Sequence, residues 1–325
     1  MSVRILLGDC RERLRGLPDG MAQTCVTSPP YFGLRDYGVD GQMGLEATPD
    51  EFIAGMVAVF REVRRVLRDD GTLWLNLGDS YANDGKWGGS TGGKHVSSLH
   101  GDSGVGRQKR TTGLKPKDLI GIPWRVAFAL QADGWYLRQD IIWHKPNPMP
   151  ESVRDRCTKA HEYVFLLSKG PRYYFDADAI KAVGGRRAPG HKSHKGQAAY
   201  ENGDAKHRTK AGLVAYAERE REREARGEVG ATRNKRSVWT VATQPFKEAH
   251  FATYPPELIE PCILAGSPRG GVVLDPFGGA GTTGLVADRL GRNAVLIELN
   301  PEYAEIARRR LAGDAGMFAN VEVAA

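Results

Sequence analysis

Thr27-Ser28-Pro29-Pro30-Tyr31 is the stretch around which the rest of the chain is organised. It follows the short apolar run Thr24-Cys25-Val26, which predicts a buried strand. Two prolines at a strand end stop the hydrogen-bond ladder and fix the backbone. The corner therefore presents a hydroxyl, a carbonyl and an aromatic ring on a rigid support. It suits a planar ring that stacks on Tyr31 and whose exocyclic amine is bonded by Ser28 and the Pro29 carbonyl; a plain turn with a packed tyrosine is the alternative.

A glycine-rich stretch near the C-terminus, Asp275 to Gly284 (DPFGGAGTTG), carries the second signal. It lies between an apolar run that predicts a strand and the start of a predicted helix, which is the context that makes a glycine motif credible. Glycines let a ligand approach the backbone closely, and a helix N-terminus favours an anionic group. Glu298 lies near the end of the following predicted strand, where a carboxylate can accept both hydroxyls of a ribose.

Three ligands compete for this glycine turn. ATP is disfavoured because a P-loop needs Gly-Lys-Ser/Thr, whereas Gly281 is followed by Thr282. The dinucleotide pattern GxGxxG is present at Gly279, Gly281 and Gly284, but Asp275-Pro276-Phe277 separates it from the strand. An acid at the strand tip would repel a pyrophosphate and suits the ammonium of a methionine moiety. The turn thus favours S-adenosylmethionine, with a purely structural glycine turn as the alternative.

Together the two motifs resemble the DNA amino-methyltransferases of the circularly permuted β class. In that family a [D/S/N]PP[Y/F/W] corner comes first, a target-recognition segment lies in the middle, and an FxGxG cofactor loop comes last. This chain has the same order, with Ser28–Tyr31, a basic segment and Phe277–Gly281. The resemblance implies an α/β fold with a Rossmann-like, seven-stranded, mostly parallel sheet, helices on both faces and one antiparallel strand. It also implies that the strand ending at Asp9 lies beside the strand ending at Glu298.

The resemblance further implies roles for single residues. Asp9 and Cys10 would flank the adenine ring, although a strand end followed by a core cysteine is the alternative, and Glu298 would hold the ribose. The acid and glycines of the turn would surround the methionine end, and residues 250–253 would close over its carboxylate. The expected catalytic residues are Ser28, Pro29, Pro30 and Tyr31; the expected cofactor residues are Asp9, Cys10, His250, Phe251, Thr253, Asp275, Phe277, Gly279, Gly281, Thr282, Thr283, Glu298 and Asn300.

Positive charge is concentrated in one part of the chain. The 325 residues carry a net charge of +7, and residues 181–236 hold 15 Lys+Arg against 7 Asp+Glu. A localised basic segment is the footprint of a nucleic-acid partner, with a solvated insertion as the alternative. We therefore predict a basic target-recognition insertion at 171–236, between a catalytic half at 1–170, with a mobile loop at about 82–113, and a cofactor-binding half at 237–325. The expected DNA contacts are Arg35, Arg186, Arg187, Lys192, Lys195, Arg208, Lys210, Arg233, Lys235 and Arg236.

The composition is that of a soluble globular protein, with 41% hydrophobic and 26% charged residues. It contains no run of 18 or more apolar residues, so we expect no membrane span. The N-terminus enters a strand-like run and is not a signal peptide. The four cysteines are scattered without a CxxC pair, which argues against a zinc site or a disulfide framework and fits the cytoplasm.

The expected reaction is site-specific methylation of double-stranded DNA. The target base would flip out of the duplex and stack on Tyr31, while Ser28 and the Pro29 carbonyl accept the N–H bonds of its exocyclic amine. Methylation at ring carbon 5 is disfavoured because Cys25 lies in the strand before the corner and not in a Pro-Cys loop. In the family that the chain resembles, a serine at the first position of the corner favours N4 of cytosine over N6 of adenine.

Two other classes of protein remain as alternatives. A catalytically inactive DNA-binding protein with this fold is opposed by the intact corner and glycine loop. An NAD-dependent oxidoreductase would use the GxGxxG pattern but leaves Ser28–Tyr31 and the basic segment unexplained. The resemblance also allows a cognate restriction endonuclease as partner, within a restriction-modification system, and either a monomer or a homodimer.

Overall fold

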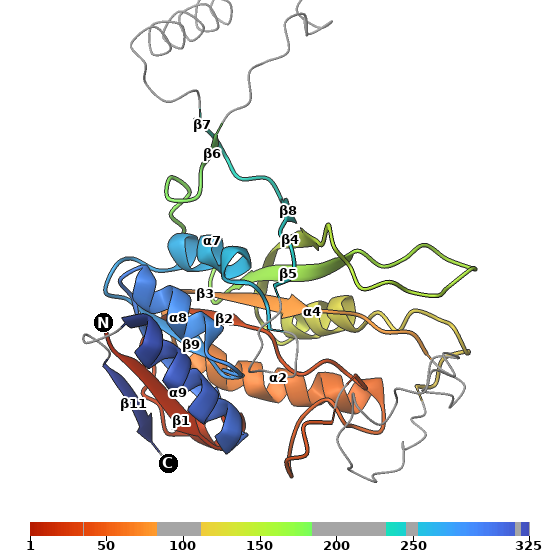
Figure 1. The fold of residues 1–325 in the computed structure, drawn as a ribbon, viewed down its shortest axis with the longest axis horizontal. Helices are drawn as coiled ribbons and strands as arrows, with labels where there is room; N and C mark the ends of the chain where they lie inside the picture. Colours follow the sequence, from red (N-terminus) through yellow and green to blue (C-terminus); the bar gives the residue numbers. More distant parts are fainter. Residues whose placement is uncertain (35, 83–111, 184–231, 245–252, 316–319, 325) are drawn as a thin grey trace, which may run out of the picture. The chain divides into compact units, whose positions relative to one another are not determined.

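A computed structural model describes residues 1–34, 36–82, 112–183, 232–244, 253–315 and 320–324 (Figure 1). By its internal contacts the chain divides into two units, one made of Met1–Asp176 with Ser237–Ala325 and the other of Ala177–Arg236. The first unit contains a large sheet with helices, and the described part of the second is a two-stranded ribbon.

Nine strands of the described residues form one sheet in the first unit, in the order β11-β1-β10-β9-β2-β3-β5-β4-β8. β5 runs antiparallel to both of its neighbours, and the other pairings are parallel. The expected mostly parallel sheet with one antiparallel strand is confirmed. Two short edge strands, β8 and β11, of three and four residues, extend the seven strands that the resemblance implied. The strands are β1 (Val3–Leu7), β2 (Ala22–Thr27), β3 (Leu67–Leu77), β4 (Tyr136–His144), β5 (His161–Ser168), β8 (Val238–Thr240), β9 (Val272–Asp275), β10 (Asn293–Glu298) and β11 (Val321–Ala324).

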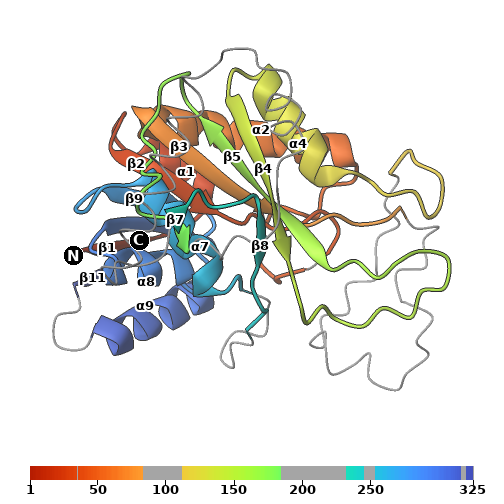
Figure 2. The same ribbon diagram turned by 90° about the horizontal axis from the view of Figure 1, so that it is seen from above.

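Helices cover both faces of the sheet, as Figure 2 shows. One face carries α1 (Cys10–Arg15), α2 (Pro49–Val66) and α4 (Ile122–Ala132), and the other carries α7 (Pro256–Gly266), α8 (Thr282–Arg289) and α9 (Pro301–Ala315). Thr48 caps the N-terminus of α2, and its side chain accepts a hydrogen bond from Glu51 N. The helix buries residues at helical spacing from Phe52 to Val66. Every residue of β2 is buried, as expected for a strand in the middle of a sheet that is covered on both faces.

The two ends of the chain meet in this sheet. β1 pairs in parallel with β10, and Leu7 lies opposite Glu298. The backbone N–H of Gly8 donates to the Glu298 carbonyl at 2.9 Å, which continues the pairing beyond the last residue of β1. The predicted neighbourhood of the first strand and the strand that ends at Glu298 is therefore confirmed.

In the second unit, β6 (Ala182–Val183) pairs antiparallel with β7 (Thr232–Arg233). This ribbon brackets residues 184–231, which lie outside the described residues together with most of the loop expected at about 82–113. Residues 171–176 belong to the first unit, because Tyr174 N donates to the Asp70 carbonyl and Asp176 N to the Ala265 carbonyl, both at 2.9 Å. Among the described residues, no helix is long and apolar enough to cross a membrane.

Candidate active site

The serine corner and the glycine turn lie at the carboxyl ends of two paired strands. β2 ends at Thr27 and leads into Ser28, and its neighbour β9 ends at Asp275. Thr27 Oγ1 donates to Asp275 Oδ1 at 2.6 Å, although the two residues are 248 positions apart in the sequence. Because parallel strands present their carboxyl ends at the same edge of a sheet, the two motifs form one site at the position where such folds bind their ligands.

Tyr31 is held on two sides. Its ring packs against the backbone of Gly78, so closely that a Cβ at position 78 would overlap the ring. Its hydroxyl donates to Glu162 Oε2 at 2.6 Å, and Asn76 Oδ1 lies 3.2 Å away. Burial and then the charge of Glu162 raise the pKa of Tyr31 well above its usual value.

In the glycine turn, two left-handed glycines have different surroundings. Gly281 has φ +76°, and a Cβ there would lie 2.9 Å from the Cβ of Ala307 in α9, so close packing requires glycine. Gly279 has φ +49°, and of the atoms of the described residues a Cβ there would meet only the Phe277 carbonyl, at 4.0 Å. Those residues therefore leave space beside Gly279, where a ligand can reach the backbone.

Asp275 is 1% exposed, and donors of the protein already occupy both of its carboxylate oxygens. Thr27 Oγ1 and Phe277 N bond to one oxygen, and Tyr254 Oη and Thr283 Oγ1 to the other, at 2.6–3.0 Å. Burial raises the pKa of Asp275, and these hydrogen bonds act in the opposite direction. Asp275 therefore ties the corner to the glycine turn, and its contact with a methionine ammonium stays a prediction.

Glu298 lies at the end of β10 beside the glycine turn. Its Oε2 accepts from Gly279 N at 2.7 Å, and its Oε1 accepts from Asn300 N at 2.8 Å. Asn300 in turn accepts from Glu302 N at 2.8 Å in the first turn of α9. Burial raises the pKa of Glu298. Within the described part of the chain each carboxylate oxygen accepts one backbone hydrogen bond, which leaves capacity for two further donors, such as the hydroxyls of a ribose.

Asp9 and Cys10 lie at the start of α1. Asp9 caps this helix, accepting from Arg11 N at 2.7 Å, and hydrogen bonds from the Arg11 side chain lower the pKa of Asp9. Cys10 is 8% exposed, and burial raises its pKa to about 12. Cys10 is thus a buried thiol at the start of α1, and the contact of Asp9 and Cys10 with an adenine ring stays a prediction.

The remaining predicted cofactor residues have unequal surroundings. Thr282 accepts from Arg310 Nη1 at 2.9 Å, and so takes part in packing between α8 and α9. Thr283 bonds to Asp275, and Phe277 packs against the core. Thr253 is described in the loop before α7, whereas His250 and Phe251 lie outside the described residues.

Of the predicted DNA contacts, only the last three can be located. Arg233, Lys235 and Arg236 are exposed in the second unit, in β7 and the segment that follows it. The other seven lie outside the described residues, namely Arg35, Arg186, Arg187, Lys192, Lys195, Arg208 and Lys210. Among the described residues, no group of three His, Cys, Asp or Glu side chains is placed to hold a metal ion.

A family model for DNA methylases, N6_N4_Mtase, matches residues 22–309. The chain belongs to this family. This DNA methylase is 46% identical over 310 residues to the type II methyltransferase M.SmaI of Serratia marcescens. The aligned region covers 95% of this chain and 91% of M.SmaI. It is 46% identical to M.Cfr9I of Citrobacter freundii, with coverages of 94% and 87%.

Solved structures of low sequence identity share the fold of this methylase. PvuII DNA methyltransferase, which is cytosine-N4-specific, superimposes with a TM-score of 0.62 at 17% identity, covering 99% of this chain and 94% of that one. TTHA0409 of Thermus thermophilus, a proposed DNA modification methylase solved with S-adenosyl-L-methionine, gives 0.57 at 24% identity, covering 99% of both chains. By its family and its relatives at 46% identity, the protein is an S-adenosylmethionine-dependent DNA amino-methyltransferase, as the sequence predicted. The oxidoreductase and inactive-protein alternatives are not retained.

Sequence reasoning missed the polar residues of β3 and β5 that surround the corner of the methylase. Asp79 follows β3, and its Oδ1 accepts from Gly121 N and Ile122 N at 3.0 Å, at the start of α4. Lys159 Nζ donates to the Asp79 carbonyl at 3.2 Å, and burial lowers the pKa of Lys159. Charged residues at strand ends are ordinary in sequence, and only the pairing of β3 with β5 brings Asp79 and Lys159 together beside the corner.

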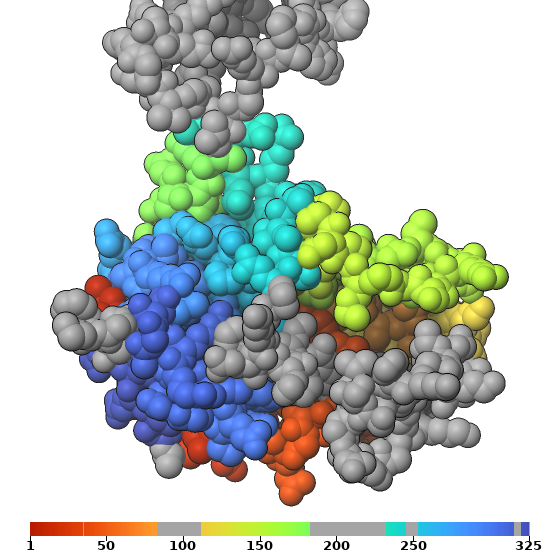
Figure 3. Space-filling model, in the orientation of Figure 1, coloured from red at the N-terminus to blue at the C-terminus, as the bar shows by residue number. Residues whose placement is uncertain are grey.

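On the face in Figure 3, the C-terminal helices form one side of the surface of the first unit, and the segment between β4 and β5 forms the other. Met149, in that segment, is 85% exposed. The segment is anchored by Asn147, whose side chain accepts from Thr243 N at 2.9 Å. Arg156 in the same segment lies 4.0 Å from the ring centroid of Tyr81 and pairs with Glu151 at 2.6 Å. These contacts hold the segment between β4 and β5 in a defined conformation.

Proposed function

We propose that this methyltransferase modifies N4 of cytosine in duplex DNA, with Ser28, Pro29, Pro30 and Tyr31 as the catalytic corner. The observation that supports the proposal most strongly is the hydrogen bond between Thr27 and Asp275, which joins the residue before Ser28 to the strand end that leads into the glycine turn. The choice of cytosine rests on Ser28, since a serine at this position goes with N4-cytosine in the family pattern. N6 of adenine is the second candidate, because a serine hydroxyl can accept from either amine.

The corner has the groups that an exocyclic amine needs in order to react. Such a nitrogen is a weak nucleophile because its lone pair is delocalised into the ring. When Ser28 Oγ and the Pro29 carbonyl accept its two N–H bonds, they favour a pyramidal nitrogen whose lone pair points at the methyl group. S-adenosylmethionine supplies that methyl from its sulfonium. As the nitrogen–carbon bond forms, the sulfur–carbon bond breaks, and the amine then loses a proton to water; positioning in a polar, pre-oriented site provides the rate.

The cofactor residues of the proposal surround the end of β9 and β10. Glu298 has unused acceptor capacity, and Gly279 leaves space at the backbone. Phe277, Gly281, Thr282, Thr283 and Asn300 shape the same turn, and Asp9 and Cys10 begin the helix after the neighbouring strand β1. Thr253 lies one residue before Tyr254, whose hydroxyl bonds to Asp275.

On the DNA side, we propose that the exposed Arg233, Lys235 and Arg236 contact backbone phosphates. The same role stays a prediction for the seven basic residues outside the described part of the chain. A cognate restriction endonuclease, and a monomeric or homodimeric state, are further proposals that rest on the family resemblance alone.

The experiment is methylation of long genomic duplex DNA with methyl-labelled S-adenosylmethionine, followed by digestion to nucleosides and mass detection. Long mixed DNA contains nearly every short word, so a missing recognition site cannot explain a lack of label. Labelled N4-methylcytosine, strongly reduced in Ser28→Ala, is the expected result. Label in N6-methyladenine would overturn the base assignment. Equal label in Ser28→Ala that binds the cofactor normally would overturn the role of the corner.

A further inference from the structure

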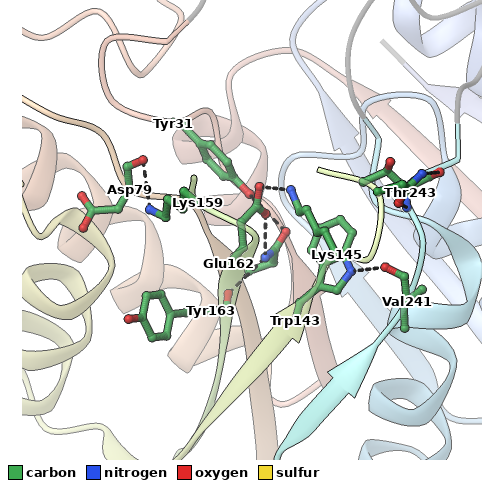
Figure 4. Close-up of polar contacts among 11 residues, drawn as sticks. Tyr31, Asp79, Trp143, Lys145, Lys159, Glu162, Tyr163, Val241 and Thr243 are labelled. Carbon is green, nitrogen blue, oxygen red and sulfur yellow. Dashed lines mark hydrogen bonds and ion pairs between the residues drawn. The ribbon is translucent and has the colours of Figure 1, made fainter. Parts of the chain in front are cut away.

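A chain of polar side chains outside the predicted site leads to the hydroxyl of Tyr31. Glu162 Oε2 accepts from that hydroxyl at 2.6 Å. Asn76 Nδ2 lies 3.3 Å from the same oxygen and donates to the Tyr163 carbonyl at 3.0 Å. The other oxygen of Glu162 is paired with the ammonium of Lys145, and Figure 4 shows Tyr31 and Lys145 both directed at Glu162. One carboxylate therefore joins the aromatic ring of the corner to a lysine.

The antiparallel pairing of β4 with β5 brings Lys145 and Glu162 together. Trp143 lies opposite Glu162, and Lys145 N donates to the Ala160 carbonyl at 2.8 Å. Lys145 Nζ lies 4.2 Å from the ring centroid of Trp143, which is a cation–π contact. Trp143 Nε1 donates to the Val241 carbonyl at 2.8 Å. The lysine is thus held by the carboxylate and by a ring that is itself anchored.

Both charges of this ion pair are largely withdrawn from water. The side chains of Lys145 and Glu162 are 19% and 15% exposed. Taking an ion pair out of water costs free energy that the mutual attraction does not always recover, so such a pair is weak support for a role in stability. Charged groups that are withdrawn from water are often found at functional sites. Glu162 of this pair accepts the hydrogen bond of Tyr31, the aromatic residue of the proposed catalytic corner. Its placement favours a role in the reaction.

We propose that Glu162, itself held by Lys145, is a positioning residue for methyl transfer that acts through Tyr31. The inference rests on the proposed function, in which the Tyr31 ring stacks on the flipped base. The backbone of Gly78 limits the ring on one side, and the bond from its hydroxyl to Glu162 fixes its rotation. The orientation of the Tyr31 ring is therefore fixed before the base binds. A base that stacks on this ring presents its amine to Ser28 without any prior reorientation of the ring.

The size of the effect follows from how sensitive transfer is to placement. A misplacement of about 1 Å by a residue away from the chemistry can cost about 10²-fold in rate. We expect Glu162→Gln to lower kcat by about 10-fold to 100-fold, because the glutamine has no charge to retain Lys145 and holds the hydroxyl less firmly. The KM for S-adenosylmethionine should stay unchanged, since Glu162 lies on the base side of the corner.

A double-mutant cycle in the full-length protein tests this inference. It compares kcat for Tyr31→Phe, Glu162→Gln and the double variant on the genomic DNA used above, with the product identified by mass. If Glu162 acts through the Tyr31 hydroxyl, all three variants lose activity to about the same extent. Tyr31→Ala should lose more, because it also removes the stacking ring. Multiplying losses in the double variant would refute the inference, because they show that Glu162 acts independently of Tyr31.

Two further variants keep the result interpretable. Glu62→Gln is a matched control, because it breaks the half-buried ion pair of 3.0 Å between Glu62 and Arg65 on α2. The kcat of this control variant should equal that of the wild type. If Glu162→Gln does not fold, Lys145→Met and Lys145→Arg replace it. Arginine should restore kcat relative to methionine, and equal kcat in both would refute the inference. A wild-type protein that methylates no exocyclic amine would instead refute the proposed function.

Discussion

Replacement of Gly279 by alanine is expected to weaken cofactor binding while leaving the fold intact. Gly279 has φ +49°, and its added Cβ would have the Phe277 carbonyl, 4.0 Å away, as its nearest neighbour in the protein. The neighbouring backbone N–H of Gly279 donates to Glu298, the proposed ribose ligand. The new methyl group therefore enters the space that we assign to the cofactor and meets no atom of the described residues closely.

The structure sets the size of both effects. An alanine in the left-handed region lowers the free energy of unfolding by about 1–2 kcal/mol. In a chain of this length, each kcal/mol lowers the melting temperature by at most about 2–4 °C. A methyl group against a bound ligand should raise the Kd for S-adenosylmethionine at least about tenfold, or about 1.4 kcal/mol. Gly281→Ala should behave differently, because its Cβ would lie 2.9 Å from that of Ala307; strain and overpacking together cost about 2–5 kcal/mol of folding free energy.

The assay is equilibrium dialysis with labelled S-adenosylmethionine, together with thermal unfolding of the same samples. Gly20→Ala is the matched control, since Gly20 has φ +64° with no atom of the described residues beyond its chain neighbours within 4 Å of its Cβ position. It also lies before β2, away from the strand ends of the site. It should carry the same backbone strain and bind the cofactor normally. If Gly279→Ala and Gly20→Ala bind S-adenosylmethionine equally well, the placement of the cofactor at Gly279 is wrong.

Three other predictions follow from the same contacts. Glu298→Gln should raise the Kd for S-adenosylmethionine by about tenfold or more in dialysis, because its amide nitrogen cannot accept hydrogen bonds; a wild-type Kd would contradict this. At pH 8, iodoacetamide should label the exposed Cys157 and spare Cys10, whose pKa of about 12 leaves about 10⁻⁴ of it as thiolate, as peptide mass mapping can check. Glutamine at Arg233, Lys235 and Arg236 should reduce the salt dependence of DNA binding by about 0.9 in log–log slope per lost phosphate contact, and an unchanged slope would refute these contacts.

The sequence predicted the parts of the site that local signals mark. Ser28–Tyr31 follows a short apolar run, and the glycine turn stands between a strand and a helix, so both could be placed at strand ends without knowledge of the sheet. The neighbourhood of β1 and β10 came from the permuted motif order. Asp275 was identified, but its four donors come from separate elements and could not be counted from the sequence.

The polar surroundings of Tyr31 could not be predicted for a different reason. Asn76 lies on β3, Glu162 on β5 and Lys145 directly after β4, and Asn76 and Glu162 are 86 residues apart in the sequence. Each would be an ordinary surface residue if its strand lay at an edge. Their meeting depends on β5 lying antiparallel between β3 and β4. The hydrophobic periodicity of one strand carries no information on that pairing. The burial of these polar side chains is therefore a property of the assembled sheet.

The two halves of the site are built by different parts of the chain, and this division is what makes them separable by mutation. The cofactor half that we propose comes from the ends of β9, β10 and β1, and the proposed base half from β2, β3 and β5. Thr27 and Asp275 link them with a hydrogen bond of 2.6 Å. Gly279→Ala should therefore change cofactor affinity and leave Tyr31 in place, whereas Glu162→Gln should do the reverse. A change at the link itself, such as Thr27→Val, removes a donor from a buried carboxylate and should disturb both halves together.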